Sequence, residues 1–160
     1  MRIARRDFLR VGAGLAAGLL LPATGTVAAS GVALQVWKDP WCGCCTSWAK
    51  HMELAGYLVS VAESDDMDGL KDRLAVPQAL RSCHTGELAG YVLEGHVPAL
   101  AVARLLAERP AITGLAVPGM PMGSPGMEGP ADSVPDLYEV IAFGAGREET
   151  FMRFRGGDAV

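Results

Sequence analysis

The chain has 160 residues, with 14 basic and 18 acidic side chains, a formal net charge of −4 and four cysteines. It has no basic patch and no lysine-rich run, which argues against nucleic acid as a partner. Once an N-terminal targeting segment is removed, the remaining length is sufficient for one domain with a hydrophobic core.

The first 29 residues have the layout of a secretory signal peptide. Arginines precede an apolar run over 11–21, and small residues at 27–29 offer a cleavage site. The pair Arg5-Arg6 followed by Phe8-Leu9 is typical of a twin-arginine signal, and an ordinary secretory signal is the alternative. The apolar run is about half of the ~20 residues that span a bilayer, so no lasting membrane anchor is expected. We predict a periplasmic protein whose residues 30–160 form one domain, with 10 basic and 17 acidic side chains, or −7.

The remaining chain predicts alternating strands and helices, with turns at its glycines and prolines. In chain order they are a strand at 33–38, a helix at 46–55, a strand at 57–61, a helix at 67–74, a hairpin with arms at 83–85 and 91–94, a helix at 98–108, a Gly/Pro/Met loop at 114–130 and a hairpin with arms at 138–143 and 150–154. The order β-α-β-α-β-β-α is that of the thioredoxin fold. We therefore predict an α/β, thioredoxin-like fold with an added Gly/Pro/Met loop and a C-terminal β-hairpin.

The strongest chemical signal is Cys42-Gly43-Cys44-Cys45, at the expected start of the first helix. A disulfide between near-adjacent cysteines closes a very short loop and therefore stabilises a fold little. A helix N-terminus stabilises thiolate, the form that binds soft metals or attacks disulfides. Cys42 and Cys45 have the C-x-x-C spacing of a redox pair. The third thiol, Cys44, favours a thiophilic ion such as copper(I).

A second candidate segment is Cys83-His84, at the start of the predicted third strand. In thioredoxin-like proteins this segment faces the C-x-x-C turn, so we expect Cys83 to complete a four-sulfur site; a lone buried cysteine is the alternative. His84 is a further candidate ligand, with a hydrogen-bond donor to a ligand or a surface residue as the alternatives. His96 is another candidate ligand, although it could instead cap a helix or bind its own backbone. His51 is expected to be a surface or packing residue. The acidic side chains at 63–68 are expected to form a solvated loop and helix start.

The Gly/Pro/Met loop supplies a third signal. It contains three of the seven methionines, Met120, Met122 and Met127. Thioether sulfur binds copper(I) and has little use for zinc, so the loop favours copper. The alternative is a flexible lid in which methionine fills irregular gaps over the domain.

Together these segments resemble a bacterial family of metal-binding domains of unknown function that includes the CopG-type periplasmic copper-resistance proteins. The matching segments are 39–48, 76–77, 82–85, 94–98 and 115–128. The resemblance covers about 34–154. It implies a thioredoxin-like fold, a role in copper tolerance, and copper bound through Cys42, Cys44, Cys45 and Cys83. His84, His96, Met120, Met122 and Met127 also match the family pattern.

Three functional hypotheses follow. The first is a copper(I)-binding protein that sequesters copper or passes it to other periplasmic copper-handling proteins, with a multi-copper thiolate cluster as an extension. The second is a thiol oxidoreductase in which Cys42 and Cys45 are catalytic, with a variant that couples their cycle to copper reduction. The third is a structural zinc site, which the methionines do not favour.

Overall fold

The structure is a computed structural model that describes residues 31–160, so the predicted signal peptide lies outside the described residues. Within 31–160 the helices are α1 (Gly43–Leu54), α2 (Met67–Arg73), α3 (Ala99–Glu108) and the 3-10 helix η1 (Gln78–Leu80). The strands are β1 (Ala33–Lys38), β2 (Leu58–Glu63), β3 (His84–Leu88), β4 (Tyr91–Glu94), β5 (Gly114–Ala116), β6 (Leu137–Gly144), β7 (Arg147–Arg155) and β8 (Asp158–Ala159). None of these helices is long and apolar enough to cross a membrane.

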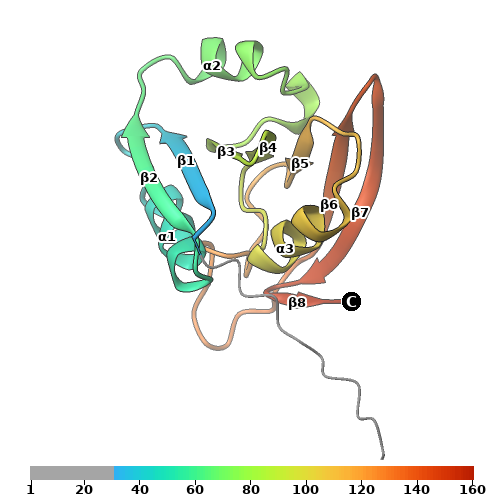
Figure 1. The fold of residues 1–160 in the computed structure, drawn as a ribbon. Helices are drawn as coiled ribbons and strands as arrows, with labels where there is room; N and C mark the ends of the chain where they lie inside the picture. The colour runs from blue at the N-terminus through green and yellow to red at the C-terminus, as the bar shows by residue number, and fades with distance from the viewer. Residues whose placement is uncertain (1–30) are drawn as a thin grey trace, which may run out of the picture.

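The strands form one mixed sheet in the order β2-β1-β3-β4-β5-β6-β7-β8 (Figure 1). The pairs β1–β2 and β4–β5 are parallel, and the other neighbours are antiparallel. The α/β class, the central hairpin β3–β4 and the C-terminal hairpin β6–β7 confirm the sequence predictions.

The alternation of side chains along the strands assigns the helices to opposite faces of the sheet. Leu93 and Leu115 pack in one core cluster with Trp48 of α1 and Val102 of α3. Their neighbours Val92 and Ala116 pack in a second cluster with Val76 and Leu80, which follow α2. Helices α1 and α3 therefore cover one face, and the segment from α2 to η1 covers the other.

One strand lies in the segment predicted to be a loop. Residues 114–116 form β5, which pairs with β4 on one side and β6 on the other. The short strand was missed because its flanks are rich in glycine and proline. Gly114 permits this pairing, since a Cβ atom there would lie 2.0 Å from the carbonyl oxygen of Val92.

Gly114→Ala is expected to lower the free energy of unfolding by about 2–3 kcal/mol, because the added methyl group must displace the backbone of β4. Urea denaturation measures the effect. The matched control is Gly157→Ala, where a Cβ atom would meet no other atom within 4 Å; its effect is expected to stay within about 0.5 kcal/mol. Equal stability of the two variants would contradict the close approach of β5 to β4.

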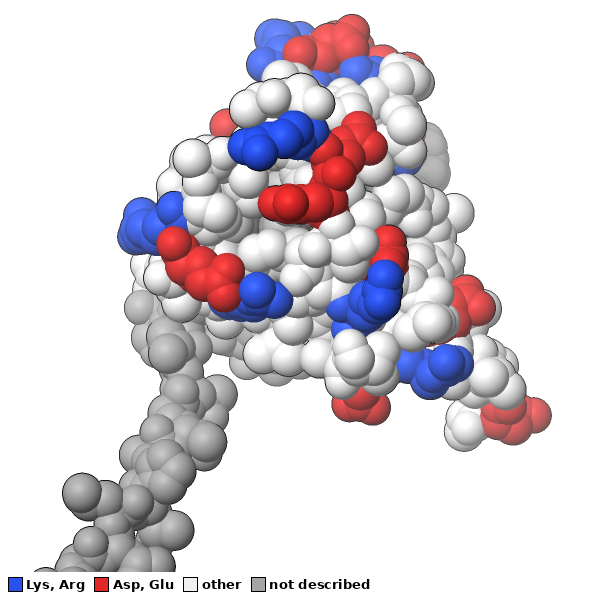
Figure 2. All heavy atoms as spheres, turned by 90° about the vertical axis from the view of Figure 1, so that its right-hand side faces the viewer, with Lys and Arg blue, Asp and Glu red and all other residues white. Residues whose placement is uncertain are grey.

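Charges of both signs are interspersed on the face of the molecule shown in Figure 2. Strand β7 illustrates the pattern, with basic Arg147 and Arg153 and acidic Glu148 and Glu149. On this face the basic side chains do not gather into a patch, in keeping with the overall negative charge.

Candidate metal centre

The turn between β1 and α1 presents three cysteines at the start of a helix. Asp39 shapes the turn, because its side chain accepts a hydrogen bond from the Trp41 N–H at 2.8 Å and its carbonyl accepts one from the Cys42 N–H at 3.0 Å. Cys42 is the N-cap of α1, and its sulfur accepts a hydrogen bond from the Cys45 N–H at 3.3 Å. Cys44 and Cys45 lie in the first helical turn of α1.

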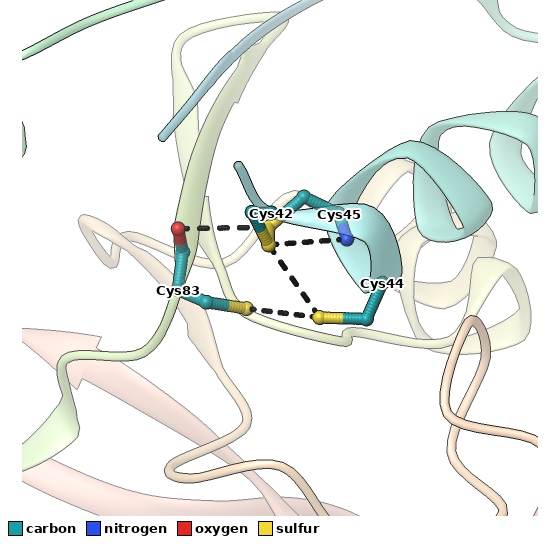
Figure 3. A group of neighbouring side chains, drawn as sticks. All are labelled: Cys42, Cys44, Cys45 and Cys83. Atoms are coloured by element: carbon teal, nitrogen blue, oxygen red, sulfur yellow. Dashed lines mark hydrogen bonds between the residues drawn. A yellow bond between two sulfur atoms is a disulfide. The ribbon is translucent and has the colours of Figure 1, made fainter. Parts of the chain in front are cut away.

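The four cysteine sulfurs form one group from two distant segments (Figure 3). Cys42 and Cys45 are joined by a disulfide, whereas Cys44 and Cys83 are free thiols. The sulfur of Cys44 lies 3.5 Å from that of Cys42 and 3.9 Å from that of Cys83. The Cys45 sulfur lies 3.6 Å from the Cys83 carbonyl oxygen. Cys83 therefore faces the three cysteines of α1, as the strand order predicts.

Sheet register explains this meeting. Lys38, the last residue of β1, pairs with His84, the first residue of β3. Because the two strands are antiparallel, the turn after β1 lies beside the residue before β3, which is Cys83. Strands β3 and β4 are also antiparallel, with Thr85 of β3 paired with Glu94 of β4. The residues that follow β4 therefore lie beside Cys83, which precedes β3. This segment contains His96.

Two imidazoles approach the Cys83 sulfur. His84 Nδ1 lies 3.4 Å and His96 Nε2 lies 3.3 Å from it, and both rings are fully buried. His96 Nδ1 lies 2.8 Å from the carbonyl oxygen of Pro125, which has no proton to donate. The Nδ1–H of His96 must therefore donate, and the lone pair of Nε2 is directed at Cys83.

His84 has an unusual environment. Within 31–160 its buried Nε2 has no hydrogen-bond partner. Its ring packs against that of Trp48 in a tilted arrangement, with the centroids 4.4 Å apart, and meets the His96 ring edge-on at 5.0 Å. Burial lowers the pKa of His84 well below its usual range, with His96 and Lys71 contributing, and burial also lowers the pKa of His96. Both rings are thus neutral at pH 7, the state in which imidazole binds metals.

Burial, assisted by the neighbouring Cys44, raises the pKa of the Cys83 thiol to about 11. Thiolate is the reactive form, so in the metal-free disulfide state the alkylation rate of Cys83 is expected to rise about tenfold per pH unit between pH 7 and 10. Mass spectrometry of iodoacetamide-labelled peptides measures the rate. A rate that levels off near pH 8.5 would contradict the raised pKa.

A buried polar network, which sequence reasoning missed, lies on the sheet face opposite α1. Lys71 of α2 forms an ion pair with Glu94 of β4, with 2.5 Å between Nζ and Oε1. Glu94 also accepts hydrogen bonds from the Ser82 N–H at 2.6 Å and the Thr85 hydroxyl at 2.7 Å. Burial raises the pKa of Glu94, while Lys71, Thr85 and Ser82 favour its carboxylate.

Residues near the cysteines also have structural roles. His51 is half-buried, and its Nε2 accepts a hydrogen bond from the Ala99 N–H at 3.2 Å at the first turn of α3. It is therefore a packing residue, as expected. Trp48 is fully buried and donates a hydrogen bond from Nε1 to the Val97 carbonyl at 2.9 Å. Trp41 is 92% exposed. The acidic segment also behaves as expected, because Asp66 is the N-cap of α2.

The Gly/Pro/Met loop packs over the start of α1. A Cβ atom at Gly126 would lie 2.7 Å from the backbone nitrogen of Trp48 and 2.8 Å from the carbonyl oxygen of Cys44. The loop also accepts a hydrogen bond at Gly119 from the Ser82 hydroxyl at 2.7 Å. Met120 and Met122 are exposed and Met127 is half-buried. At Gly126 and Gly119 the loop therefore contacts the site through its backbone.

The donor atoms suit a soft metal ion. Donors that share one ion at ~2.0–2.3 Å lie roughly 3.2–4.0 Å apart in tetrahedral or trigonal geometry, and the Cys42–Cys44 and Cys44–Cys83 sulfur distances and the distances from the Cys83 sulfur to the two imidazoles are of this size. Two overlapping groups can be formed, one of four sulfurs and one of Cys83 with His84 and His96. Thiolate and imidazole are typical ligands of copper and zinc. Because two sulfurs are joined in a disulfide, the four-sulfur group becomes available only after reduction.

Comparison with known proteins agrees with this site. The family model described as "Protein of unknown function, DUF411" matches residues 80–127, which include Cys83, His84 and His96. Two solved structures described as "Copper resistance protein copG", forms 1 and 2, match with 43% and 42% identity and a TM-score of 0.73 each. Each match covers 78% of this chain, and 98% or 99% of the other chain. A search of curated proteins gives no match.

At this identity, and with nearly the whole of each related chain matched, the likeness extends well beyond the cysteine motif. The matched family model independently includes the Cys83-His84 segment and residues 114–127 of the Gly/Pro/Met loop. The chain belongs to the DUF411 family of CopG-type copper resistance proteins.

Proposed function

We propose that this protein binds copper(I) through the thiolates of Cys42, Cys44, Cys45 and Cys83 and contributes to copper tolerance outside the cytoplasm. One observation carries the proposal: four cysteine sulfurs from two distant segments lie within 4.8 Å of one another. Identity of 43% to a copper resistance protein supports copper as the ion.

Copper(I) is the ion that this donor set suits best. Soft thiolates select copper(I), and the carboxylates needed for a hard cation are not part of the cysteine group. Each thiolate can bridge two ions, so four thiolates can hold several coppers in a cluster. His84 and His96 could supply nitrogen ligands at one side of this cluster, and Met120, Met122 and Met127 are candidate thioether ligands when copper enters.

The wider context belongs to the same proposal. Residues 1–29 would export the protein by the twin-arginine route to the periplasm, where 30–160 act as one domain. The segment β1 to α3 would be thioredoxin-like; the sheet order β2-β1-β3-β4, with only β1–β2 parallel among these strands, supports this. Other periplasmic copper-handling proteins would be its exchange partners.

Metal analysis of protein purified from the periplasm of copper-supplemented cells tests the proposal. Thiols are counted with and without a copper chelator. We expect more than one copper per chain and thiols that react only after chelation. Metal-free protein with reactive thiols, or zinc in place of copper, would contradict it.

The Cys42–Cys45 disulfide favours a second candidate function, a thiol oxidoreductase. Reduction of the disulfide takes up two electrons and two protons from a dithiol, which becomes a disulfide in turn. In a copper-coupled variant, the Cys42 and Cys45 thiols give one electron each to two copper(II) ions, release two protons and form the disulfide, which leaves two copper(I) ions. Activity on a scrambled disulfide substrate that survives chelation and is lost in Cys42→Ser would establish the exchange reaction. Absence of such activity in the wild type would exclude it.

A further inference from the structure

The starting observation is a charge pair in the protein interior. The Lys71 and Glu94 side chains are only 4% and 0% exposed. Moving two charges out of water costs several kcal/mol each, and an apolar pair of similar volume is often equally stable there. Stability alone therefore does not explain why this ion pair is buried. The hydrogen bonds of Glu94 and Lys71 indicate another role.

Glu94 binds both sides of the dipeptide Cys83-His84. Its Oε1 accepts the Ser82 N–H at 2.6 Å, and its Oε2 accepts the Thr85 hydroxyl at 2.7 Å. Lys71 Nζ bonds to the same Thr85 hydroxyl at 2.8 Å, so all four groups are connected. Thr85 is also held by the β-ladder, whereas Ser82 precedes β3. The bond from Glu94 thus fixes the backbone N–H of Ser82 on the N-terminal side of Cys83, where the bond from the Ser82 hydroxyl to the Gly119 carbonyl oxygen is a second anchor.

Cys83 depends on such an anchor more than the other cysteines do. Cys42, Cys44 and Cys45 lie on one turn at the start of α1, so local helix geometry sets their spacing. The distance of 3.9 Å between the sulfurs of Cys83 and Cys44 is instead set by tertiary structure. The network reaches Cys83 from the sheet face opposite α1, which leaves the sulfur free to face the other three.

We infer that Lys71 and Glu94 are positioning residues, which hold Cys83 at the distance from Cys44 that a shared metal ion requires. Glu94 acts as the acceptor for the Ser82 N–H, and Lys71 orients its carboxylate by donating a hydrogen bond to it. Outer groups of this kind fix ligand orientation in metal sites. The inference rests on the proposed copper function, and its first test is independent of copper.

The test uses two double variants of the full chain. Lys71→Met with Glu94→Leu removes both charges and the acceptor, and Lys71→Met with Glu94→Gln removes both charges but keeps an amide oxygen. In metal-free, Cys42–Cys45-oxidised protein, the readout is the alkylation rate of Cys83 divided by that of Cys44. Global loosening would also raise this ratio, because it removes the burial that slows alkylation of Cys83, so circular dichroism and urea denaturation first establish that each variant is folded. The control is Arg153→Met with Glu139→Leu, which removes a remote ion pair of 2.8 Å.

We expect the ratio to rise about tenfold or more in the leucine variant, through local opening at Ser82, and to stay within about threefold of wild type in the glutamine variant and the control. A ratio unchanged in the leucine variant, or raised equally in the glutamine variant, would overturn the inference. If the leucine variant does not fold, hydrogen exchange of the Ser82 amide in the wild-type protein tests whether this N–H is held by Glu94. Exchange at least about 100-fold slower than in an unstructured chain is expected, and exchange at the unstructured rate would overturn the inference.

A second experiment measures the copper(I) affinity of the same variants. The leucine variant is expected to bind copper(I) about 10–100-fold more weakly than wild type, and the glutamine variant nearly as tightly as wild type. Equal affinity in the leucine variant would show that the position of Cys83 does not matter for copper. If wild-type protein binds no copper, the proposed function fails, while the alkylation ratio still decides the positioning role.

Discussion

Cys83→Ser is expected to weaken copper(I) binding by the reduced protein about 100-fold or more, because loss of an outer-shell partner alone costs about 10–100-fold and here a ligand itself is lost. Cys83 contacts Cys44 and both buried histidines, so its removal separates the three sulfurs of α1 from the nitrogen donors. Serine is nearly isosteric with cysteine and leaves the polar surroundings intact. Titration with copper(I) in competition with a chromophoric chelator measures the affinity.

Met67→Ser is the matched control, since it also replaces a sulfur by a hydroxyl but lies in the first turn of α2. Its copper affinity and stoichiometry are expected to equal those of wild type. If Cys83→Ser binds copper as tightly as this control, the three cysteines of α1 are sufficient. The proposed four-thiolate site would then be wrong.

Trp48→Ala is expected to cost about 3–5 kcal/mol in the free energy of unfolding, the range for truncation of a large buried aromatic side chain. Trp48 lies in the main core cluster, and its ring packs against His84. Its indole N–H also joins α1 to Val97, just before α3. Urea denaturation followed by circular dichroism measures the loss.

The two tryptophans beside the cysteines provide an internal comparison. Trp41→Ala, at a side chain that is 92% exposed, is expected to change stability by less than about 0.5 kcal/mol. Trp48→Phe keeps most of the packing but leaves the Val97 carbonyl without its donor, and is expected to cost about 1–3 kcal/mol. A larger loss of unfolding free energy in Trp41→Ala than in Trp48→Ala would contradict the burial of Trp48 and the exposure of Trp41.

The meeting of Cys83 with the α1 cysteines could be predicted because it follows from strand order. Once β1 and β3 are antiparallel neighbours, the turn after one must face the start of the other, whatever the intervening side chains. Strong local patterns also determined α3 and the C-terminal hairpin. The α/β class is confirmed, and the thioredoxin-like assignment remains a prediction.

The buried Lys71–Glu94 pair could not be predicted in the same way. Lys71 lies in the polar sequence of α2, beside Asp72 and Arg73, and nothing in that sequence marks one lysine as buried. Glu94 lies 23 positions later, and its burial depends on how α2 crosses the sheet. Strand β5 was missed for a related reason, since three residues beside glycine acquire their conformation from β4 and β6.

The redox state of the cysteines was also beyond sequence analysis. Cys42-Gly43-Cys44-Cys45 permits a disulfide, a metal site or both in turn. The structure joins Cys42 to Cys45 and leaves Cys44 and Cys83 free. Copper binding by all four sulfurs therefore requires prior reduction, and the two states of the site are expected to exclude each other.

The most direct test of four-thiolate copper binding is a copper(I) titration of the same protein in its reduced and its Cys42–Cys45-oxidised states, with alkylation of all four cysteines at saturation. We predict that the reduced protein binds more than one copper per chain and that all four thiols are protected. The oxidised protein is predicted to bind fewer ions, with lower affinity. Equal binding by both states, or copper bound with Cys42, Cys45 and Cys83 fully reactive, would contradict the proposed site.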